Sequence, residues 1–373
     1  MNKKLIAIAI AGALAAPLAA QAEVTIYGTM DVSIDSINND VKGNDTDSSL
    51  AASSNSSNIG FKGAEDLGGG MKAIWQAEAG VNPTDANNGG SNSWAARNTI
   101  VGLAGGFGTF VLGRHDTPYK VLGIKGQFFV NGIGDTRTLT NIDAQDARAN
   151  NVIAYISPNM NGVSLFAAYV TDLAGSGMDN TDNGAYSVSL SYANGPLFIG
   201  VANQKIKQDG VPAKYNTVPD ADPQATRVVA SYKLGGLKVA ANWQQDKNVA
   251  GLDGFDNTGW GLGAAYTMGN NTVKAMFQNA GEFDNTDKTG ATKWAIGIDH
   301  AMSKQTTLYA AYAATSNDDN AFYSVTGAAD GHGDSGPQGT NLNTIDASNL
   351  AATDVDEPGN SPTAFSIGIK HKF

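Results

Sequence analysis

One stretch of the chain has the residue types for nucleophilic catalysis. In HGDSGP, residues 332–337, a serine stands between an aspartate and a glycine, as in the nucleophile motif of serine proteases. Such catalysis also needs a histidine and a carboxylate that a rigid scaffold holds against the serine. Ser335 instead lies within a 46-residue polar segment, 317–362, that is rich in Gly, Asn and Asp. We therefore interpret the motif as part of a long exposed loop and predict no catalytic residue.

A second stretch has part of the pattern of a calcium loop. In DNTDNG, residues 179–184, an acid stands first and a glycine sixth. The twelfth position, which should hold a bidentate Glu, is Leu190, so the pattern favours a turn before a strand. Metal-ligand spacing is also lacking among the four histidines, His115, His300, His332 and His371. We predict no metal site and no cofactor.

The segment 317–362 is strongly acidic. It has no lysine or arginine and eight acids, Asp318, Asp319, Asp330, Asp334, Asp346, Asp354, Asp356 and Glu357. We interpret it as a solvated external loop. The alternative is weak bridging by divalent cations to anionic lipopolysaccharide.

The N-terminus has the features of an export signal. Two lysines precede an apolar run, residues 5–18, that is too short to span a membrane. An Ala-Gln-Ala sequence then offers the small residues that a signal peptidase requires. We predict a signal peptide over 1–22 and a mature chain that starts at Glu23.

Composition limits what the exported chain can be. The full 373-residue sequence has no cysteine and a formal net charge of −11, and this acidic balance argues against nucleic acid as a partner. No run of about 18 apolar residues follows residue 22, so no transmembrane helix is predicted. Without disulfides, the fold must be stabilised by packing or by a closed hydrogen-bonded sheet.

Alternation of large apolar with small or polar residues predicts strands throughout this chain. In AYSVSLSYA, residues 185–193, the tyrosines, Val188 and Leu190 alternate with serines, which gives a strand two unlike faces. The same pattern predicts sixteen strands, at 23–35, 55–65, 70–79, 97–104, 107–114, 148–157, 162–171, 184–193, 196–205, 225–234, 237–246, 258–268, 271–281, 291–301, 306–316 and 363–373.

The connections alternate between short turns and long loops. The turns are sequences such as DLGG, ANG and GNN, and the long loops are polar, with the longest at 36–54, 115–147, 206–224 and 317–362. An even number of antiparallel strands, with short turns at one rim and long loops at the other, is typical of an outer-membrane barrel.

The placement of charge indicates which face meets lipid. One phase of the strands holds large apolar residues, such as Ile26, Val239 and Ile367. The opposite phase holds the charged residues Asp31, Lys62, Lys72, Glu78, Arg97, Arg148, Arg227, Lys233, Lys238, Lys274, Lys293, Asp299 and Lys370. A Lys or Arg facing lipid at the midplane costs about 2–4 kcal/mol, so the charged phase must face water.

Barrel width separates this interpretation from a soluble one. In a soluble barrel the apolar phase would fill the interior, but sixteen strands enclose a space too wide for side chains to fill. We therefore predict an all-β fold: a 16-stranded antiparallel transmembrane β-barrel with a wet lumen. A soluble β-sandwich is the alternative.

Several motifs resemble a known family. SSNIGFKGAEDLGGGMKAIWQAE (56–78), RNTIVGLAGGFGTFVLGR (97–114), NNVIAYISPNMNG (150–162) and the ending GIKHKF (368–373) resemble the general porins of Gram-negative bacteria, above all the neisserial and β-proteobacterial group. The resemblance spans the mature chain, 23–373. It implies a homotrimer of barrels in the cell outer membrane, surrounded by lipid and lipopolysaccharide, with a constriction loop, 115–147, that folds inward.

The resemblance also implies which residues matter. Arg97 matches a basic wall position of the family, whereas Asn58, Thr29 and Ile156 stand where relatives carry basic residues. The residues left for the pore constriction are Arg97, Arg148, Lys62, Asp135, Asp143 and Asp146. The family further implies that Phe373 is an assembly signal, recognised by the barrel-assembly machinery.

The expected function is passive diffusion of ions and small hydrophilic solutes through a water-filled channel, without catalysis. One alternative is a substrate-selective channel, for which Phe128, Phe129, Phe166 and Tyr309 supply the few aromatic residues. A barrel enzyme such as an outer-membrane phospholipase is a second alternative, although His300 and His371 have no identifiable serine partner. A structural or adhesive barrel is a third.

Overall fold

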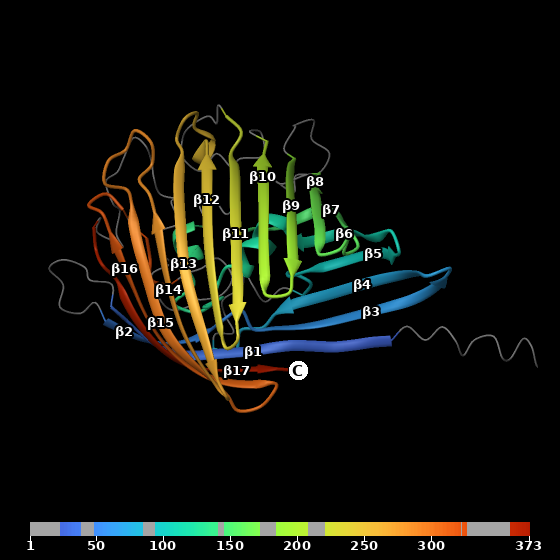
Figure 1. The fold of residues 1–373 in the computed structure, drawn as a ribbon, viewed down its shortest axis with the longest axis horizontal. Helices are drawn as coiled ribbons and strands as arrows, with labels where there is room; N and C mark the ends of the chain where they lie inside the picture. Colours follow the sequence, from blue (N-terminus) through green and yellow to red (C-terminus); the bar gives the residue numbers. More distant parts are fainter. Residues whose placement is uncertain are drawn as a thin grey trace, which may run out of the picture.

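The computed structural model describes residues 23–38, 48–84, 94–140, 145–171, 184–207, 221–321, 323–326 and 359–373. They contain seventeen antiparallel strands in one sheet (Figure 1): β1 (Glu23–Asn38), β2 (Ser48–Ser54), β3 (Asn58–Gly68), β4 (Met71–Gly80), β5 (Thr99–Gly105), β6 (Gly108–Asp116), β7 (Arg148–Ile156), β8 (Val163–Val170), β9 (Ala185–Asn194), β10 (Leu197–Ile206), β11 (Gln224–Leu234), β12 (Leu237–Lys247), β13 (Asn257–Met268), β14 (Asn271–Ala280), β15 (Ala291–Ala301), β16 (Thr306–Asn317) and β17 (Thr363–Lys372).

The sheet closes on itself through its first strand. β1 pairs with β3 through its residues 23–29 and with the last strand, β17, through its residues 29–38. Each of the strands from β3 to β17 pairs with its neighbour in sequence. This ring has sixteen strand positions, which confirms the predicted barrel. A closed ring leaves no row of unpaired backbone groups at an edge.

β2 is the strand that the alternation pattern missed, since its residues fall in the predicted loop 36–54. It pairs with residues 32–38 of β1, beyond the part of β1 that pairs with β3. The two short strands therefore occupy one position in the ring, interrupted at residues 55–57, where Ser56 has a φ of 63°. In β2 Leu50 is the single large apolar residue, so the period-2 signal is weak.

The two rims of the barrel differ as predicted. Hairpins such as β11–β12 and β13–β14 are joined by two-residue turns, in which Gly235 and Gly269 have φ values near 58°. Glycine adopts this left-handed conformation without a steric penalty. The turn between β11 and β12 lies at the lower rim in Figure 1, and the longer connection between β12 and β13 lies at the opposite rim.

Outward side chains are apolar and exposed, and inward ones are small or polar and buried. Along β12, Val239 and Trp243 are 42% and 39% exposed, while the alternating Ala240 and Gln244 are 5% and 1% exposed. A soluble protein has the reverse pattern. The outer surface therefore suits lipid, and the exposed Trp243, Trp260 and Trp294 suit the aromatic girdles of such barrels.

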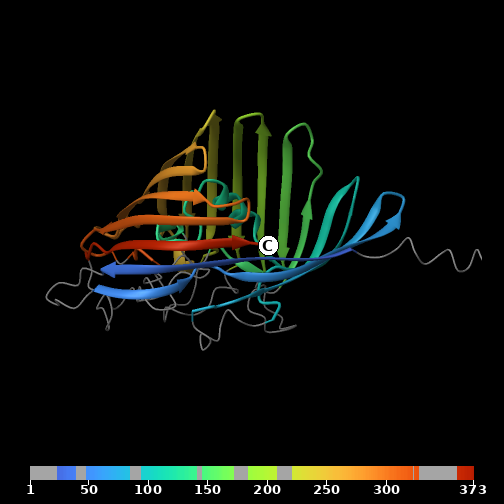
Figure 2. The same ribbon diagram turned by 90° about the horizontal axis from the view of Figure 1, so that it is seen from below.

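The connection between β6 and β7 folds into the barrel, as Figure 2 shows for the chain coloured teal to green. It contains the helices α2 (Pro118–Lys125) and α3 (Arg137–Thr140). Thr117 caps α2 by accepting a hydrogen bond from the backbone N–H of Lys120, and Pro118 occupies the first turn. In the described ranges no helix is long and apolar enough to cross a membrane.

Two apolar clusters seat this internal loop, residues 117–147, against the wall. Tyr119 and Leu122 of α2 pack on Ala202, Ala225 and Val229 of β10 and β11. A second cluster joins Phe129 and Ile133 of the loop to small wall residues of β15 and β16, among them Ala295 and Ala311. One further short helix, the 3₁₀ helix η3 (Val249–Gly251), lies between β12 and β13.

Candidate pore constriction

A buried ion pair holds the internal loop to the wall. Arg227 of β11 binds Asp146, near the end of the loop, with Nη1 2.6 Å from Oδ1 and Nη2 3.1 Å from Oδ2. Both side chains are almost completely buried. Such a bidentate pair is geometrically specific, and removing one partner of a buried pair costs about 3–5 kcal/mol. The pair therefore fixes this end of the loop.

Neighbouring groups extend this contact. Gln244 of β12 accepts a hydrogen bond from Arg227 at 2.8 Å, and its amide donates to the carbonyl of Thr140 at 2.8 Å and to Asp246 at 2.7 Å. The guanidinium carbon of Arg227 lies 4.1 Å from the ring centroid of Tyr119 in α2. Burial raises the pKa of the Tyr119 phenol well above its usual value, although the charge of Arg227 opposes this. The phenol therefore stays neutral.

A lysine makes the second attachment. The ammonium group of Lys293, on β15, donates to the carbonyl of Asp135 at 3.1 Å and to the hydroxyl of Thr138 at 3.0 Å, both in the internal loop. It also donates to the carbonyl of Val325 at 2.8 Å, in the connection between β16 and β17. One wall residue, fully buried, thus binds the internal loop and a segment of the longest connection.

An ion pair inside the loop stabilises its own bend. Asp135 binds the guanidinium of Arg137 at 2.6 Å and accepts hydrogen bonds from the backbone N–H groups of Asn131 and Arg137. Burial tends to raise the pKa of this carboxyl, but the charge of Arg137 and these hydrogen bonds outweigh it, so the pKa is lowered. Asp135 therefore stays ionised where it is buried.

Arg148 lies where the loop begins and ends. Asp116, at the end of β6, binds Arg148 Nη2 at 3.1 Å and the ammonium of Lys120 at 3.2 Å. Asn98 donates to Asp116 at 3.1 Å and accepts from Arg148 at 3.0 Å. These contacts join both ends of the loop to the start of β5.

Among the described residues, Arg97 binds the wall and not the internal loop. Its guanidinium forms an ion pair with Glu78 of β4 and donates to the hydroxyl of Ser56 at 3.0 Å. Glu78 also accepts from the hydroxyl of Tyr27, on β1, at 3.0 Å. Lys62 is exposed and lies with its ammonium 5.0 Å from the ring centroid of the same Tyr27. Arg97 and Lys62 thus belong to one wall region that includes Tyr27.

The structure therefore distributes five of the six predicted constriction residues over several clusters. Asp146 and Asp135 belong to the two attachments of the internal loop, and Arg148 lies at the base of the loop. Arg97 and Lys62 lie on the wall beside Tyr27, and Asp143 lies outside the described residues.

Two residues that attach the loop were not selected from the sequence, namely Arg227 and Lys293. Both were placed in the charged phase that faces the lumen, and that placement is correct. What the pattern lacked was a signal that a wall cation is buried by the loop rather than exposed in the pore. Such a buried cation can be identified only when the position of the loop against the wall is known.

The end of the chain is bonded to β1. The backbone N–H of Phe373 donates to the carbonyl of Gly28 at 3.1 Å, and the N–H of Gly28 donates back to an oxygen of Phe373 at 3.1 Å. The Phe373 side chain is exposed, in phase with Ile367 and Ile369 on the outer surface. Within the described part of the chain, no group of three His, Cys, Asp or Glu residues could hold a metal ion.

Sequence comparison identifies relatives of this chain. A family model for Gram-negative porins matches residues 7–320. Outer membrane porin protein 32 of Delftia acidovorans is 29% identical over 384 residues, which cover 100% of both chains. The major outer membrane protein P.IB of Neisseria gonorrhoeae is 30% identical over 298 residues, or 74% of this chain and 82% of the relative.

Solved structures share the fold. The structure described as an anion-selective porin from Comamonas acidovorans superposes with a TM-score of 0.73 at 26% identity, covering 95% of this chain and 100% of that one. Vibrio cholerae OmpT, described in its trimer form, has a TM-score of 0.65 at 16% identity, covering 94% and 99%. Because the family model covers most of the chain and the barrel agrees with it, this protein belongs to the Gram-negative porins, non-enzymatic channels for diffusion across the outer membrane.

Proposed function

We propose that the internal loop, residues 117–147, forms the narrowest part of the channel and sets the size limit for small hydrophilic solutes. The observation that carries this proposal is the buried, bidentate pair between Arg227 and Asp146. A loop that was free to move could not define a constant limit, whereas one attached at both Arg227 and Lys293 can. Asp143 belongs to the same loop and stays a predicted constriction residue.

The proposed channel has a weak preference for anions at high salt. Inward-facing lysines such as Lys62 and Lys238 have no ion-pair partner among the described residues, while the acids Glu78, Asp116 and Asp146 do. The anion-selective porin from Comamonas acidovorans, similar in fold, supports the same sign. The acidic connection 317–362 opposes this preference, but salt screens exposed charges beyond about 8–10 Å. At low salt the preference should therefore move towards cations.

The proposed assembly is a homotrimer in lipid and lipopolysaccharide. OmpT of Vibrio cholerae, which has the same fold, is described as a trimer. The apolar outer surface of β1, where Val24 and Ile26 are exposed, provides area for contact with lipid or a second copy. We further propose that residues 1–22 are the export signal, that 23–373 form the mature barrel, and that the barrel-assembly machinery recognises Phe373.

Single-channel recording in planar bilayers tests the constriction. The purified protein should give stable open steps in KCl, and neutral polyethylene glycols above a threshold size should fail to lower the conductance. Arg227→Met should raise that threshold if the loop sets the limit. An unchanged threshold, in a variant that still inserts and conducts, would contradict the proposal.

A further inference from the structure

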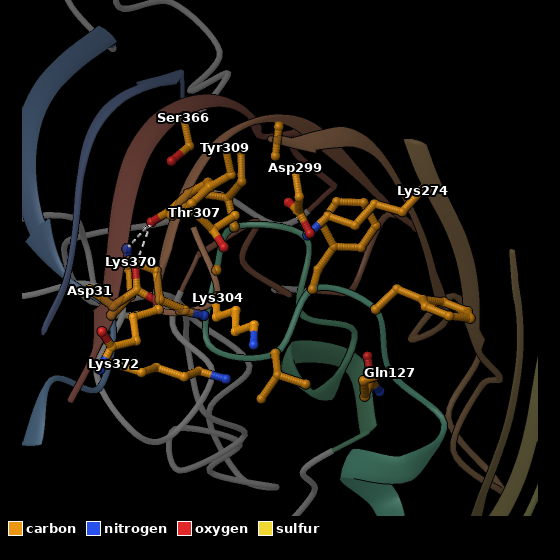
Figure 3. Close-up of a pocket in the computed structure, with 18 residues that line it drawn as sticks. Asp31, Gln127, Lys274, Asp299, Lys304, Thr307, Tyr309, Ser366, Lys370 and Lys372 are labelled. Carbon is orange, nitrogen blue, oxygen red and sulfur yellow. Dashed lines mark hydrogen bonds and ion pairs between the residues drawn. The ribbon is translucent and has the colours of Figure 1, made fainter. Parts of the chain in front are cut away.

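A cavity lies beside the internal loop, next to the rim with the short turns. Its volume is about 320 Å³, and it is bounded by residues 127–133 of the loop, by inward-facing residues of β14 to β17 and β1, and by the turn between β15 and β16. Figure 3 shows side chains from these elements around one space. The volume is at the small end of the range of about 300–1,000 Å³ for ligand pockets.

Lysines outnumber acids in this cavity. Four lysines line it, Lys274, Lys304, Lys370 and Lys372, against two acids, Asp31 and Asp299. Both acids are already neutralised, because Asp31 lies 2.7 Å from Lys370 and Asp299 lies 2.7 Å from Lys274.

The excess charge comes from the turn and from the end of the chain. Lys304 and Lys372 are exposed, extend towards the cavity in Figure 3, and have no ion pair with any described residue. Phe373 does not line the cavity, and its backbone oxygen accepts the N–H of Gly28. Among the residues that the structure describes, these two ammonium groups of the cavity therefore have no counter-ion.

The loop side of the cavity is apolar and the wall side is polar. Phe128, Phe129 and Ile133 form part of the loop side. The ammonium of Lys274 lies 4.7 Å from the ring centroid of Phe129, which helps to hold that ring in place. Gln127, Gln305 and Thr307 add groups that can donate hydrogen bonds. A small molecule with a short carbon body and charged ends would suit this lining.

We propose that the cavity is a binding subsite for small dianions in transit, either dicarboxylates or phosphate monoesters. Lys304 and Lys372 bind the two negative charges, and the loop phenylalanines contact the carbon body. This proposal rests on the proposed function, since the solute must first pass the constriction. Short turns lie at the periplasmic rim of such barrels, so the subsite is on the periplasmic side of the loop.

A subsite of this kind makes transport saturable for its ligand. A solute that binds slows the passage of other ions through the same channel, whereas a solute that diffuses past does not. Inhibition of the chloride current by succinate or glycerol 3-phosphate therefore measures occupancy of the subsite. Acetate, with one charge, and glycerol, with none, are the control solutes and should not inhibit with saturation. Comparing succinate with glycerol 3-phosphate distinguishes the two kinds of dianion.

The test compares wild-type protein with the Lys304→Gln/Lys372→Gln variant in planar bilayers. Succinate or glycerol 3-phosphate should reduce the chloride current with saturation, and the concentration for half inhibition should rise about tenfold in the variant. Lys72→Gln/Lys233→Gln is the matched control, because both lysines lie near the short-turn rim, are exposed and do not line the cavity. The control should leave that concentration unchanged.

The outcomes separate this proposal from the channel function. Open channels that show no saturation with either dianion would overturn the subsite and leave the porin intact. Equal loss of inhibition in the control variant would mean that general charge, and not this cavity, attracts anions. If Arg227→Met and the wild type had the same polymer size threshold, that result would count against the constriction and not against the subsite.

Discussion

The cations at the two attachments of the loop and those in the lysine-lined cavity differ in burial and in pairing. At the attachments, Arg227 and Lys293 are buried, and each donates hydrogen bonds both to the loop and to groups outside it. In the cavity, Lys304 and Lys372 are exposed and without a counter-ion among the described residues. Both sets face the lumen, so the direction of a side chain does not by itself reveal its role.

The difference follows from solvation. A buried charge is stable only when hydrogen bonds and an opposite charge replace its water, so burial selects for complete pairing and fixed geometry. An exposed charge keeps its water and can exchange it for a passing ion. We infer that the buried cations hold the loop in position and that the exposed cations act on solutes. Substitutions at the two sets should therefore have separable effects.

The largest effect is expected from Arg227→Met. This substitution removes the bidentate ion pair of the buried Asp146 carboxylate, at a cost of about 3–5 kcal/mol, and releases the end of the loop. The free energy of unfolding should fall, and the single-channel conductance should rise or become noisy. Thermal unfolding in detergent and bilayer recording measure the two effects.

The double variant Arg227→Met/Asp146→Leu is the control for a stranded charge. Replacing both members of a buried pair by apolar residues is often close to neutral in stability. The double variant should recover stability while its conductance stays altered. If conductance also returned to the wild-type value, packing rather than the ion pair would hold the loop.

A smaller loss of stability is expected from Lys293→Met. Two loop acceptors and the carbonyl of Val325 lose their donor, and an unsatisfied buried acceptor costs about 1–3 kcal/mol. Lys205→Met is the matched control, because its ion pair with Asp222 is partly exposed and should contribute less than about 1 kcal/mol. Similar melting temperatures for the two variants would contradict the prediction that the buried lysine contributes more to stability than the exposed one.

The barrel was predictable because its signals are repeated. Alternation, turn spacing and the phase of charge recur in every hairpin, so an error in one strand does not change the fold. β2 was missed because it is short and, apart from Leu50, consists of Ala and Ser. Its pairing depends on the length of β1, which continues past the end of β3, and the strand pattern does not encode that length locally.

The constriction was less predictable because it depends on contacts between distant residues. The alternation pattern placed Arg227 and Lys293 in the lumen, and the family resemblance implied that the loop folds inward. Which cation meets which acid depends on where α2 and α3 pack, through Tyr119, Leu122 and the small wall residues beneath them. Arg97 matched a family position, but its partner here is Glu78, on the neighbouring strand.

Arg97→Gln tests a charge that is intermediate between the buried cations of the loop attachments and the exposed cations of the cavity. Arg97 is partly exposed and paired with Glu78, so its loss leaves a negative charge at the wall. The reversal potential across a KCl gradient at high salt should move towards cation selectivity. Glu78→Gln should move it in the opposite direction, and the double variant should lie near the wild type. If Arg97→Gln had no effect, this pair would lie outside the conducting path.

The smallest effect is expected from acid, because the pKa of the Asp135 carboxyl is lowered: burial tends to raise it, but the charge of Arg137 and the hydrogen bonds outweigh burial. A carboxyl with a lowered pKa in the folded state contributes stability above its unfolded pKa, near 3.8, and loses it only as the pH falls through the lower folded value. Its ion pair with Arg137 should therefore persist, and the conductance should stay constant, between pH 7 and about pH 4. Asp135→Asn removes that contribution throughout this pH range, so its melting temperature should lie below the wild-type value between pH 7 and about pH 4. A rise in the conductance of the wild type already at pH 5, absent in Asp135→Asn, would contradict this prediction. It would show that the buried pair between Asp135 and Arg137 titrates as an exposed ion pair does.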